Sequence, residues 1–461
     1  MLSATVFVMK WLAQLRAGFW ILATLYIVAC FAALTFLQHG SVQAYVIVFG
    51  LLMALYGVAA WCLFKGTLHR PGAEAKALAA ILVIAALLRG IALPAPQVLS
   101  SDAYRYVWDG RVQAAHVNPY RYIPADPALR SLRDTAIYPN INRADYAHTI
   151  YPPTAQLAFF AIEQISDGIP AMKLGLLLFD GLIIACLIAL LRHHGLPATH
   201  VLLYAWHPLP IWEFAGAGHV DSIAIALLLL AYLFFARRAS TFTGIALAAA
   251  TLVKYYPVVA APALYRRWDW RMPVAFVMTL ALLYLPYMRV GVDVSGFLSG
   301  YATEEGLRDG GGIWLLSLLK SLFSVPTDSW RLFVPIATAL MLVLSLWVQV
   351  SGKYRENRDV SGGLLLASSF TVLVSPHYPW YFTWLVPFLC FQFSPAHLWL
   401  TGSCALMYLW TDPTGVATQS VKSVMYVPFL LLVLVQLGLK RRMNSPEASY
   451  EDRSVRPASI L

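Results

Sequence analysis

The chain has 461 residues, of which 59% are hydrophobic and only 12% are charged. Soluble globular proteins carry about 25% charged residues, so this composition excludes an ordinary soluble enzyme and indicates a polytopic membrane protein. The net charge of +10 would suggest a nucleic-acid partner in a soluble protein, but here it marks cytoplasmic loops, and we expect no nucleic acid to bind.

Apolar segments recur from end to end and predict about 13–14 helices that cross the membrane or enter it partway. They lie at 19–38, 44–64, 76–94, 172–191, 198–214, 220–236, 242–253, 257–265, 273–287, 330–350, 362–375, 382–393, 397–410 and 424–439. We therefore expect N-terminal transmembrane helices in 1–97, a large extracytoplasmic loop in 98–171, a transmembrane bundle in 172–440 and a disordered cytoplasmic tail in 441–461. The predicted fold class is an all-α polytopic membrane protein.

Lysine and arginine residues recur in alternate loops, and the positive-inside rule then places both termini in the cytoplasm. The same alternation places the 98–171 loop on the outer face, together with the segments "EFAGAGHVD", "GYATEEGLRDGGG" and "SPHYPWYF". No cleavable signal is evident, so we expect a multi-pass protein of a bacterial cytoplasmic (inner) membrane.

The segment "TFTGIALAAATLVKYYPVVAAPALYRR" is too short for two full spans and too long for one. Basic residues follow it at one end and precede it at the other. We expect a helical hairpin that enters the membrane and returns, with "KYYP" at the turn.

The stretch "SSDAYRYVWDGR" begins the long loop and is the most polar passage near a predicted span. In a helix, Asp102 and Asp109 share one face, and Arg105 neighbours both carboxylates. A carboxylate held ionised by an arginine can accept a proton from an alcohol, which makes Asp102 a candidate general base. The alternative is that Asp102 only caps the helix.

Two regions, the long loop and the segment "SPHYPWYF", carry further candidate substrate-binding side chains. In the loop, turn-and-aromatic motifs form either platforms for a sugar or lipid headgroup, or an aromatic belt at the membrane interface. The same choice holds for "SPHYPWYF". The candidates are Tyr104, Arg105, Asp109, Arg111, Asn118, Tyr120 and Tyr151 in the loop, and His377, Tyr378 and Trp380 near the C-terminal end.

Ionisable residues in or beside membrane helices are costly and usually functional. Glu213, His219 and Asp221 lie close in sequence, where they either bind a divalent metal or cap and connect helices. Lys254 lies within the apolar hairpin beside Tyr255. Its ammonium group is suited either to a phosphate anion or to a structural salt bridge.

An ordered set of motifs runs along the chain: the acid after an early span, "YRYVWDGR", "NPY", "YPP", "LYAWHPLPIWEFAGAGHVD", "LVKYYPVVAAPAL" and "PHYPWY". In this order the motifs resemble the GT-C membrane glycosyltransferases, and most closely glycosyltransferase family 87, whose members use polyprenol-phosphate-mannose. The resemblance runs from about Leu93 to Phe388. It implies Asp102 as the general base and Lys254 as the contact for the donor phosphate. Some relatives have paired acids where this chain has a single one, so we expect no metal cofactor.

The resemblance implies a hexosyltransferase that moves mannose from a polyprenyl-phosphate donor to a hydroxyl of a glycolipid or glycan acceptor on the outer face, by inverting displacement. This chemistry also needs a base, a cation at the leaving phosphate and an apolar groove. The alternatives are a transporter or flippase for a lipid-linked or anionic substrate, and an assembly protein without catalysis. A transporter would place polar residues along a path through both leaflets, whereas here they gather on one predicted face.

Overall fold

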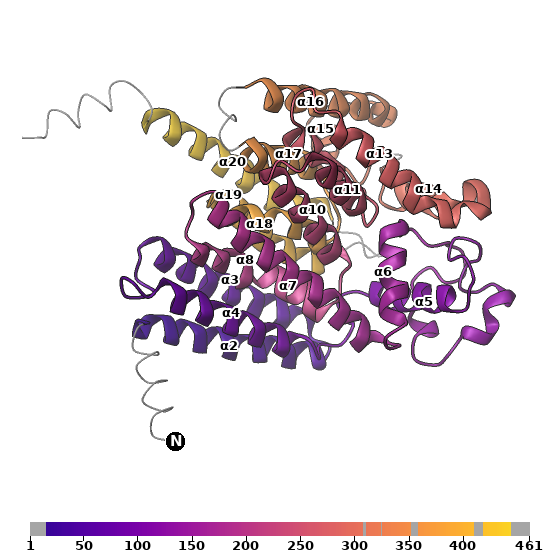
Figure 1. Cartoon of the computed structure of the whole chain (residues 1–461), viewed down its shortest axis with the longest axis horizontal. Helices are drawn as coiled ribbons and strands as arrows, with labels where there is room; N and C mark the ends of the chain where they lie inside the picture. The colour runs from indigo at the N-terminus through magenta and orange to yellow at the C-terminus, as the bar shows by residue number, and fades with distance from the viewer. Residues whose placement is uncertain (1–14, 308–309, 324, 352–357, 410–417, 444–461) are drawn as a thin grey trace, which may run out of the picture.

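The structure is a computed structural model that describes residues 15–307, 310–323, 325–351, 358–409 and 418–443. Apart from one isolated bridge between Leu15 and His69, these described residues form helices and connecting loops rather than strands. The predicted all-α polytopic fold is therefore confirmed. Figure 1 shows the helices gathered into one elongated bundle.

Seven of the described helices are long and apolar enough to cross a membrane. They are α2 (Ala17–Gln38), α3 (Val42–Phe64), α4 (Glu74–Ala92), α7 (Ile169–His193), α13 (Arg271–Tyr284) with the turns of η6 (Leu285–Ser295), α16 (Trp330–Val350) and α20 (Gln419–Met443). Each coincides with a predicted span, because about 20 apolar residues in helical form match the hydrocarbon core. Two shorter apolar helices, α10 (Asp221–Ala236) and α17 (Arg358–Val374), also agree with predicted segments.

The predicted span 198–214 is wrong as a continuous helix. It forms η3 (Ala198–Val201), α8 (Leu202–Ala205), α9 (Pro208–Pro210) and the π-helical η4 (Ile211–Gly216). Proline removes a backbone donor and interrupts the helical ladder, which explains the breaks. Such irregular backbone is tolerated at membrane depth only where protein surrounds it, and every residue from Val201 to Asp221 is buried.

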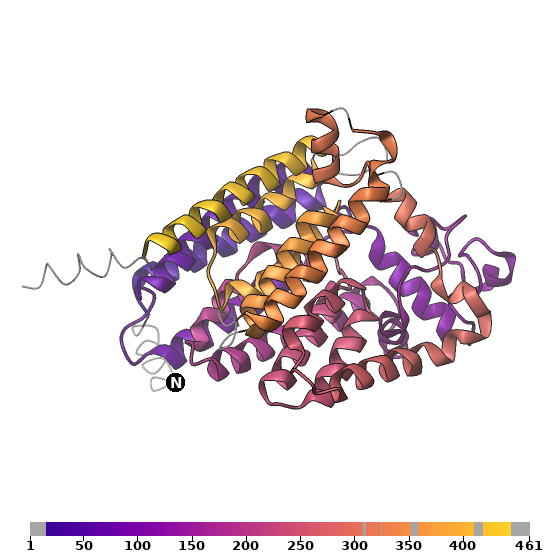
Figure 2. The ribbon, with the colours of Figure 1, turned by 90° about the horizontal axis from the view of Figure 1, so that it is seen from above.

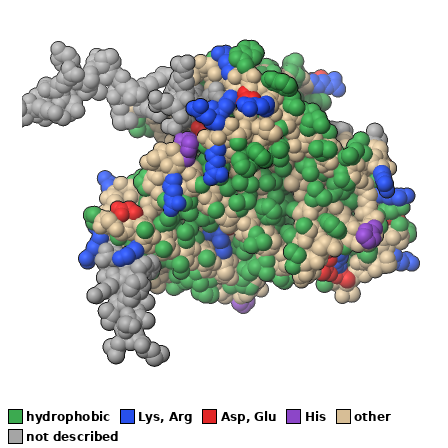
Figure 3. All heavy atoms as spheres, viewed as in Figure 1, with side chains coloured by type: hydrophobic (Ala, Val, Ile, Leu, Met, Phe, Trp, Pro, Cys, Tyr) green, Lys and Arg blue, Asp and Glu red, His purple; other side chains and the backbone are tan. Residues whose placement is uncertain are grey.

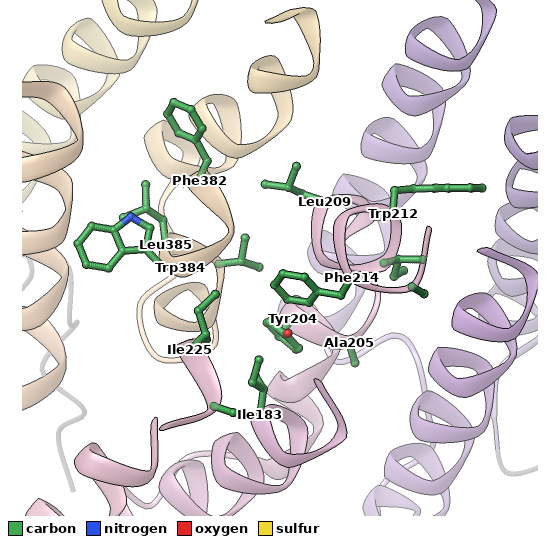
Figure 4. Close-up of a cluster of buried hydrophobic side chains, with 14 of the residues drawn as sticks. Ile183, Tyr204, Ala205, Leu209, Trp212, Phe214, Ile225, Phe382, Trp384 and Leu385 are labelled. Atoms are coloured by element: carbon green, nitrogen blue, oxygen red, sulfur yellow. The ribbon is translucent and has the colours of Figure 1, made fainter. Parts of the chain in front are cut away.

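The predicted spans 382–393 and 397–410 are interrupted in the same way. They correspond to η9 (Pro379–Leu385), α18 (Val386–Leu389), α19 (Pro395–Ser403) and η10 (Cys404–Tyr408). Figure 4 shows side chains of η9 facing those of the 204–214 segment in the buried core. Broken helices from two distant parts of the sequence therefore form the centre of the bundle.

The predicted hairpin has the expected order of helix, turn and helix, with Lys254 at the turn. It consists of α11 (Ser240–Thr251), a turn that holds Lys254, η5 (Tyr256–Ala260) and α12 (Ala261–Leu264). Helix α11 packs between α10 and α13. Gly244 permits this packing, since a Cβ there would lie 2.2 Å from the carbonyl oxygen of Met272.

The long loop is ordered as α5 (Asp102–Ala114), η1 (Pro127–Leu132), η2 (Tyr138–Asn140) and α6 (Pro153–Glu163), with α5 packed on α6. Two short helices that the hydropathy pattern did not predict, α14 (Leu298–Glu304) and α15 (Trp314–Leu322), follow α13. A further turn, η7 (Thr327–Ser329), precedes α16.

Figures 1 and 2 place α5, α6 and α14 together at one end of the bundle and the C-terminal part of α20 at the other. Figure 3 shows a broad hydrophobic surface across the middle of the molecule, with lysines and arginines mainly along its left, upper and right margins. This pattern is that of a bundle whose middle contacts lipid and whose ends contact water.

Candidate active site

A cavity of about 670 Å³ lies where the long loop meets α14, the hairpin and η9; we refer to it as the chamber. Its lining comes from seven separate stretches of the sequence, and its charged members are Asp102, Arg143, Lys254, Glu304 and Glu305. Tyr378 and Trp380 add aromatic surface. The structure thus brings together the polar loop, residues 301–305, residues 378–381 and the hairpin turn.

Asp102 lies at the wall of the chamber. It is the first residue of α5, and the position before it, Ser101, makes no capping bond with its side chain. The Nδ2 amide of Asn142 donates to Asp102 Oδ1 at 2.8 Å. The carboxylate therefore has one fixed hydrogen bond and a face toward the cavity, which is the arrangement that a general base requires.

Arg105 contacts only one of the two acids of α5 that were expected beside it. Its Nε donates to Asp109 Oδ1 at 2.9 Å, and its Nη1 donates to the carbonyl of Ala147 at 3.2 Å. Asp109 is buried and also accepts from Thr149 and from Gln156. Arg105 and Asp109 thus connect α5 to the rest of the loop and do not line the chamber.

Lys254 lies at the edge of the chamber. Its Nζ donates to Asp221 Oδ2 at 2.7 Å and lies 4.4 Å from the centre of the Tyr381 ring. Asp221 is completely buried, at the start of α10, whereas the Lys254 side chain remains 12% exposed. The predicted salt bridge is present. An ammonium group has three donors, so this bond leaves capacity for an anion in the cavity.

A second cavity of about 270 Å³, the α17 groove, adjoins the chamber at Lys254. The two cavities share the lining residues Ile150, Tyr151, Lys254, Tyr301, Glu305 and Tyr381. The remainder of the groove is mostly apolar, with Leu298 of α14, Phe370 and Val374 of α17, and Trp384 of η9. The polar chamber and the apolar α17 groove therefore meet at Lys254.

Glu213 and His219 lie behind the chamber, fully buried. His219 Nδ1 is 2.9 Å from Glu213 Oε2, and neither ring nitrogen of His219 forms a hydrogen bond within the described residues. The Tyr408 hydroxyl donates to the same carboxylate at 2.9 Å. The His219 ring stacks on Trp380 at 4.1 Å, and Trp380 stacks on Tyr378 at 4.5 Å. This pair therefore supports the aromatic wall of the chamber.

The metal interpretation of His219 and Asp221 finds no support in their positions. Asp221 contacts Lys254 and His219 contacts Glu213, so the two side chains serve different partners. In the described ranges, no group of three or more His, Cys, Asp or Glu side chains is placed to hold a metal ion.

Other candidate residues from the sequence divide between the groove and the surrounding loop. Tyr151 lines both cavities, and Tyr255 and His377 line the α17 groove, where His377 Nδ1 contacts Glu305. Four candidates lie outside both cavities: Tyr104 packs against the core, Arg111 pairs with Asp134 and Asp167, Asn118 donates to the Tyr287 carbonyl, and Tyr120 donates to the Tyr151 carbonyl.

Sequence reasoning missed the rim of the chamber. Arg143 Nε donates to Glu304 Oε2 at 2.6 Å, and the Tyr146 hydroxyl donates to Glu304 Oε1 at 2.9 Å. Burial disfavours the charged guanidinium, but the bond to Glu304 outweighs this effect and holds the pKa of Arg143 above its usual value. The sequence predicts "GYATEEGLRDGGG" on the outer face. Only the fold shows that Glu304 of this segment contacts Arg143 and Tyr146 of "NRADY".

Residues 5–269, more than half of the chain, match the family model of the alpha-(1->6)-mannopyranosyltransferase N-terminal domain. The chain belongs to this mannosyltransferase family. The matched region holds α5, Asp102 and the hairpin with Lys254, and it ends before α13. Comparisons with curated proteins and with solved structures found no match. The resemblance to GT-C mannosyltransferases is confirmed, while the closer likeness to family 87 stays a prediction.

Proposed function

We propose that this mannosyltransferase uses a polyprenyl-phosphate-linked mannose as its donor. The observation that carries the proposal is the junction of the chamber with the α17 groove at Lys254. Such a donor has a polar sugar, a charged phosphate and an apolar chain in that order. The sugar fits the polar chamber, the phosphate fits the ammonium group of Lys254, and the first part of the chain fits the groove.

Asp102 acts as the general base in this proposal. The acceptor hydroxyl oxygen attacks C1 of mannose while its proton passes to the Asp102 carboxylate. The bond between C1 and the phosphate oxygen breaks, and polyprenyl phosphate leaves with the electron pair. Lys254 stabilises the negative charge that develops on that phosphate. Asn142 keeps the Asp102 carboxylate oriented toward the chamber through its 2.8 Å hydrogen bond.

One displacement inverts the configuration at C1, so a β-linked donor yields an α-linked product. The word "alpha" in the description of the family agrees with this outcome. The acceptor is a hydroxyl of a glycolipid or glycan. The mechanism uses Lys254 and requires no metal cofactor, since Asp102 is the single acid in "SSDAY".

For the topology we propose that the chamber opens on the outer face of a bacterial cytoplasmic membrane, with both termini in the cytoplasm. Two of the helices that line the chamber, α5 and α14, lie at the end of the bundle away from the C-terminal part of α20. The alternation of basic loops along the sequence supports this orientation.

The test uses purified protein in lipid with polyprenyl-phosphate-mannose and a panel of mannoside acceptors. Wild type releases polyprenyl phosphate, and Asp102→Asn lowers this rate by about 10²–10⁴-fold while donor binding remains. Asp145→Asn is the matched control, because Asp145 is an exposed acid of the same loop that lines neither cavity. Turnover by Asp102→Asn equal to that of wild type would remove Asp102 from the mechanism. Transport without transfer would favour the transporter alternative.

A further inference from the structure

The two ends of the hairpin are both basic; we refer to them together as the hairpin base. Residues 237–238, both arginines, form the turn from α10 into α11, and residues 266–271 ("RRWDWR") lead from α12 into α13. Two hydrogen bonds cross between these ends. Ser240 Oγ donates to Asp269 Oδ2 at 2.5 Å, and Arg266 Nη2 donates at 2.7 Å to a backbone carbonyl near the end of α10. The hairpin base is therefore one surface built from two turns.

The hairpin base lies far from the chamber. Helix α10 begins at Asp221, which pairs with Lys254 at the chamber edge, and it reaches the base after 16 residues, or about 24 Å of helix. From the base, the candidate span Arg271–Gly291 leads on to α14, whose Glu304 lines the chamber. The base therefore lies toward the opposite membrane surface from the chamber, which is the cytoplasmic surface in the orientation proposed above.

The hairpin base has more positive charge than its own acid neutralises. The single acid of the two turns is Asp269, which pairs with Arg271 at 2.8 Å. The five arginines are Arg237, Arg238, Arg266, Arg267 and Arg271. In the described part of the chain, Arg237, Arg238 and Arg267 are exposed and form no salt bridge. The base therefore offers unpaired guanidinium groups from both turns.

The two turns also bring like charges together. Burial and the neighbouring guanidinium of Arg238 lower the pKa of Arg266, and the acids Asp269 and Asp359 only partly offset this effect. Arg238 and Arg266 belong to different turns, so their repulsion opposes the closure of the base. An anion placed between the turns would remove that repulsion.

Two tryptophans flank Asp269 at the base. Trp268 is 85% exposed and Trp270 is 69% exposed. Trp268 has a φ of 65°, a left-handed backbone conformation that is uncommon for a bulky residue. Tryptophan is enriched at the depth of lipid headgroups, because its ring is apolar and its N–H needs a polar partner. Residues 267–271 line a cavity of about 470 Å³, so the cations and the aromatic rings border one space.

We propose that the hairpin base binds the headgroup of an anionic phospholipid. Guanidinium groups from both turns contact the phosphate, and the two tryptophans contact the glycerol region and the upper part of the acyl chains. The bound lipid bridges the two ends of the hairpin and adds to the hydrogen bonds that join them. This site is distinct from the one proposed for the donor phosphate at Lys254, and the inference does not depend on the proposed function.

Arg238→Gln/Arg267→Gln tests the site, because it removes one exposed arginine from each turn and breaks no salt bridge. Lys65→Gln/Arg70→Gln is the matched control, since it removes two exposed cations from the turn between α3 and α4. The alternation of basic loops places that turn on the same side of the membrane as the base. The control therefore separates a specific site from the general attraction of basic loops to anionic lipid.

Native mass spectrometry of the full chain in detergent, with phosphatidylglycerol or phosphatidylcholine added at equal concentration, measures lipid binding. We expect wild type and the control to prefer phosphatidylglycerol equally. The arginine variant should bind it about 30-fold more weakly, a factor of about five for each arginine. Equal weakening in the control, or no preference in wild type, would overturn the proposal. So would displacement of the lipid by an equal concentration of glycerol phosphate, which would assign the site to a free anion.

Fluorescence quenching in nanodiscs gives a second test, because Trp268 and Trp270 belong to the site. The fluorescence that Trp268→Phe/Trp270→Phe removes reports on the hairpin base. We expect phosphatidylglycerol with brominated acyl chains to quench this part more strongly than brominated phosphatidylcholine does, and the arginine variant to lose the difference. Equal quenching of wild type by the two lipids would mean that bulk bilayer lipid alone covers the tryptophans, and the proposal would fail.

Discussion

The two aspartates of α5, Asp102 and Asp109, differ in everything but residue type and helix. Asp102 lines the chamber and accepts one hydrogen bond, from Asn142. Asp109, two turns further along, is 1% exposed and accepts from Arg105, Thr149 and Gln156. A carboxylate with satisfied partners and no access to a cavity maintains structure, whereas one with a free face toward a cavity can exchange a proton.

Two buried ion pairs show the same difference between a cavity wall and a packed interior. Asp180 of α7 pairs with Arg89 of α4 and accepts from the Tyr204 hydroxyl at 2.6 Å, and neither charged residue lines a described cavity. Lys254 has its pair with Asp221 and also borders two cavities. The Arg89–Asp180 pair therefore joins α4 to α7. The Lys254–Asp221 pair borders cavities that a substrate can enter.

We expect the largest difference between Asp102 and Asp109 in the free energy of unfolding of their variants. Asp109→Asn leaves the buried guanidinium of Arg105 without its counter-charge, and we expect a loss of roughly 3–5 kcal/mol. Asp102→Asn keeps an acceptor for Asn142 and should leave stability near that of wild type. Thermal unfolding midpoints of the two variants in the same detergent measure this. Equal midpoints would contradict the structural role of Asp109.

We expect removal of the Lys254 ammonium group to lower kcat/KM by about 10²-fold. This is the loss seen when one group that stabilises a developing oxyanion is removed. Lys254→Met loses the proposed phosphate contact but also leaves Asp221 buried without a cation. The double variant Lys254→Met/Asp221→Asn removes both charges and therefore separates the two effects. Loss in both variants supports the phosphate role, whereas recovery of wild-type activity in the double variant would reduce Lys254 to a structural salt bridge.

The smallest expected effect is at the far end of α5 and α6, where Glu163 lies near Asp167 and Arg111. Burial, with the nearby charge of Asp167, raises the pKa of Glu163 to about 7. A carboxyl group with a raised folded-state pKa stabilises the fold below its unfolded value of 4.5, and this contribution is lost as the pH rises from 4.5 to 7.

Glu163→Gln mimics the protonated carboxyl group and should remove this pH dependence. Because the side chain is partly exposed, we expect a difference of less than about 1 kcal/mol above neutral pH. Unfolding midpoints of wild type and variant, followed across the window from 4.5 to 7, measure the effect. Parallel curves for the two proteins would show that Glu163 is not the source of the pH dependence.

Hydropathy was a reliable guide wherever a helix is long and touches lipid. The spans at α2, α3, α4, α7, α16 and α20 are all confirmed. It was wrong in the centre of the bundle, where Pro208 and Pro210 break the 198–214 segment. Apolar composition reports that a segment is shielded from water, but protein and lipid shield it equally well, and only lipid demands an unbroken helix.

Closeness in sequence did not predict which partners the ionisable residues contact. Glu213, His219 and Asp221 form a short cluster in the chain, but the first two support the aromatic wall and the third pairs with Lys254. The reason is that Asp221 begins a new helix, α10, after the π-helical turn that holds Glu213. Arg143 and Glu304 show the reverse case, since they are far apart in the chain and in contact at the rim.

By itself the sequence determined the class of the molecule: its apolar runs require a helical membrane bundle, and its ordered motifs point to a mannosyltransferase. It also singled out Asp102 and Lys254, because charge is conspicuous beside apolar helices. Only the tertiary structure decided which of two aspartates faces a cavity, and that an apolar groove lies next to the chamber at Lys254. Cavities depend on how distant helices pack, and no local pattern in the chain records the space that packing leaves empty.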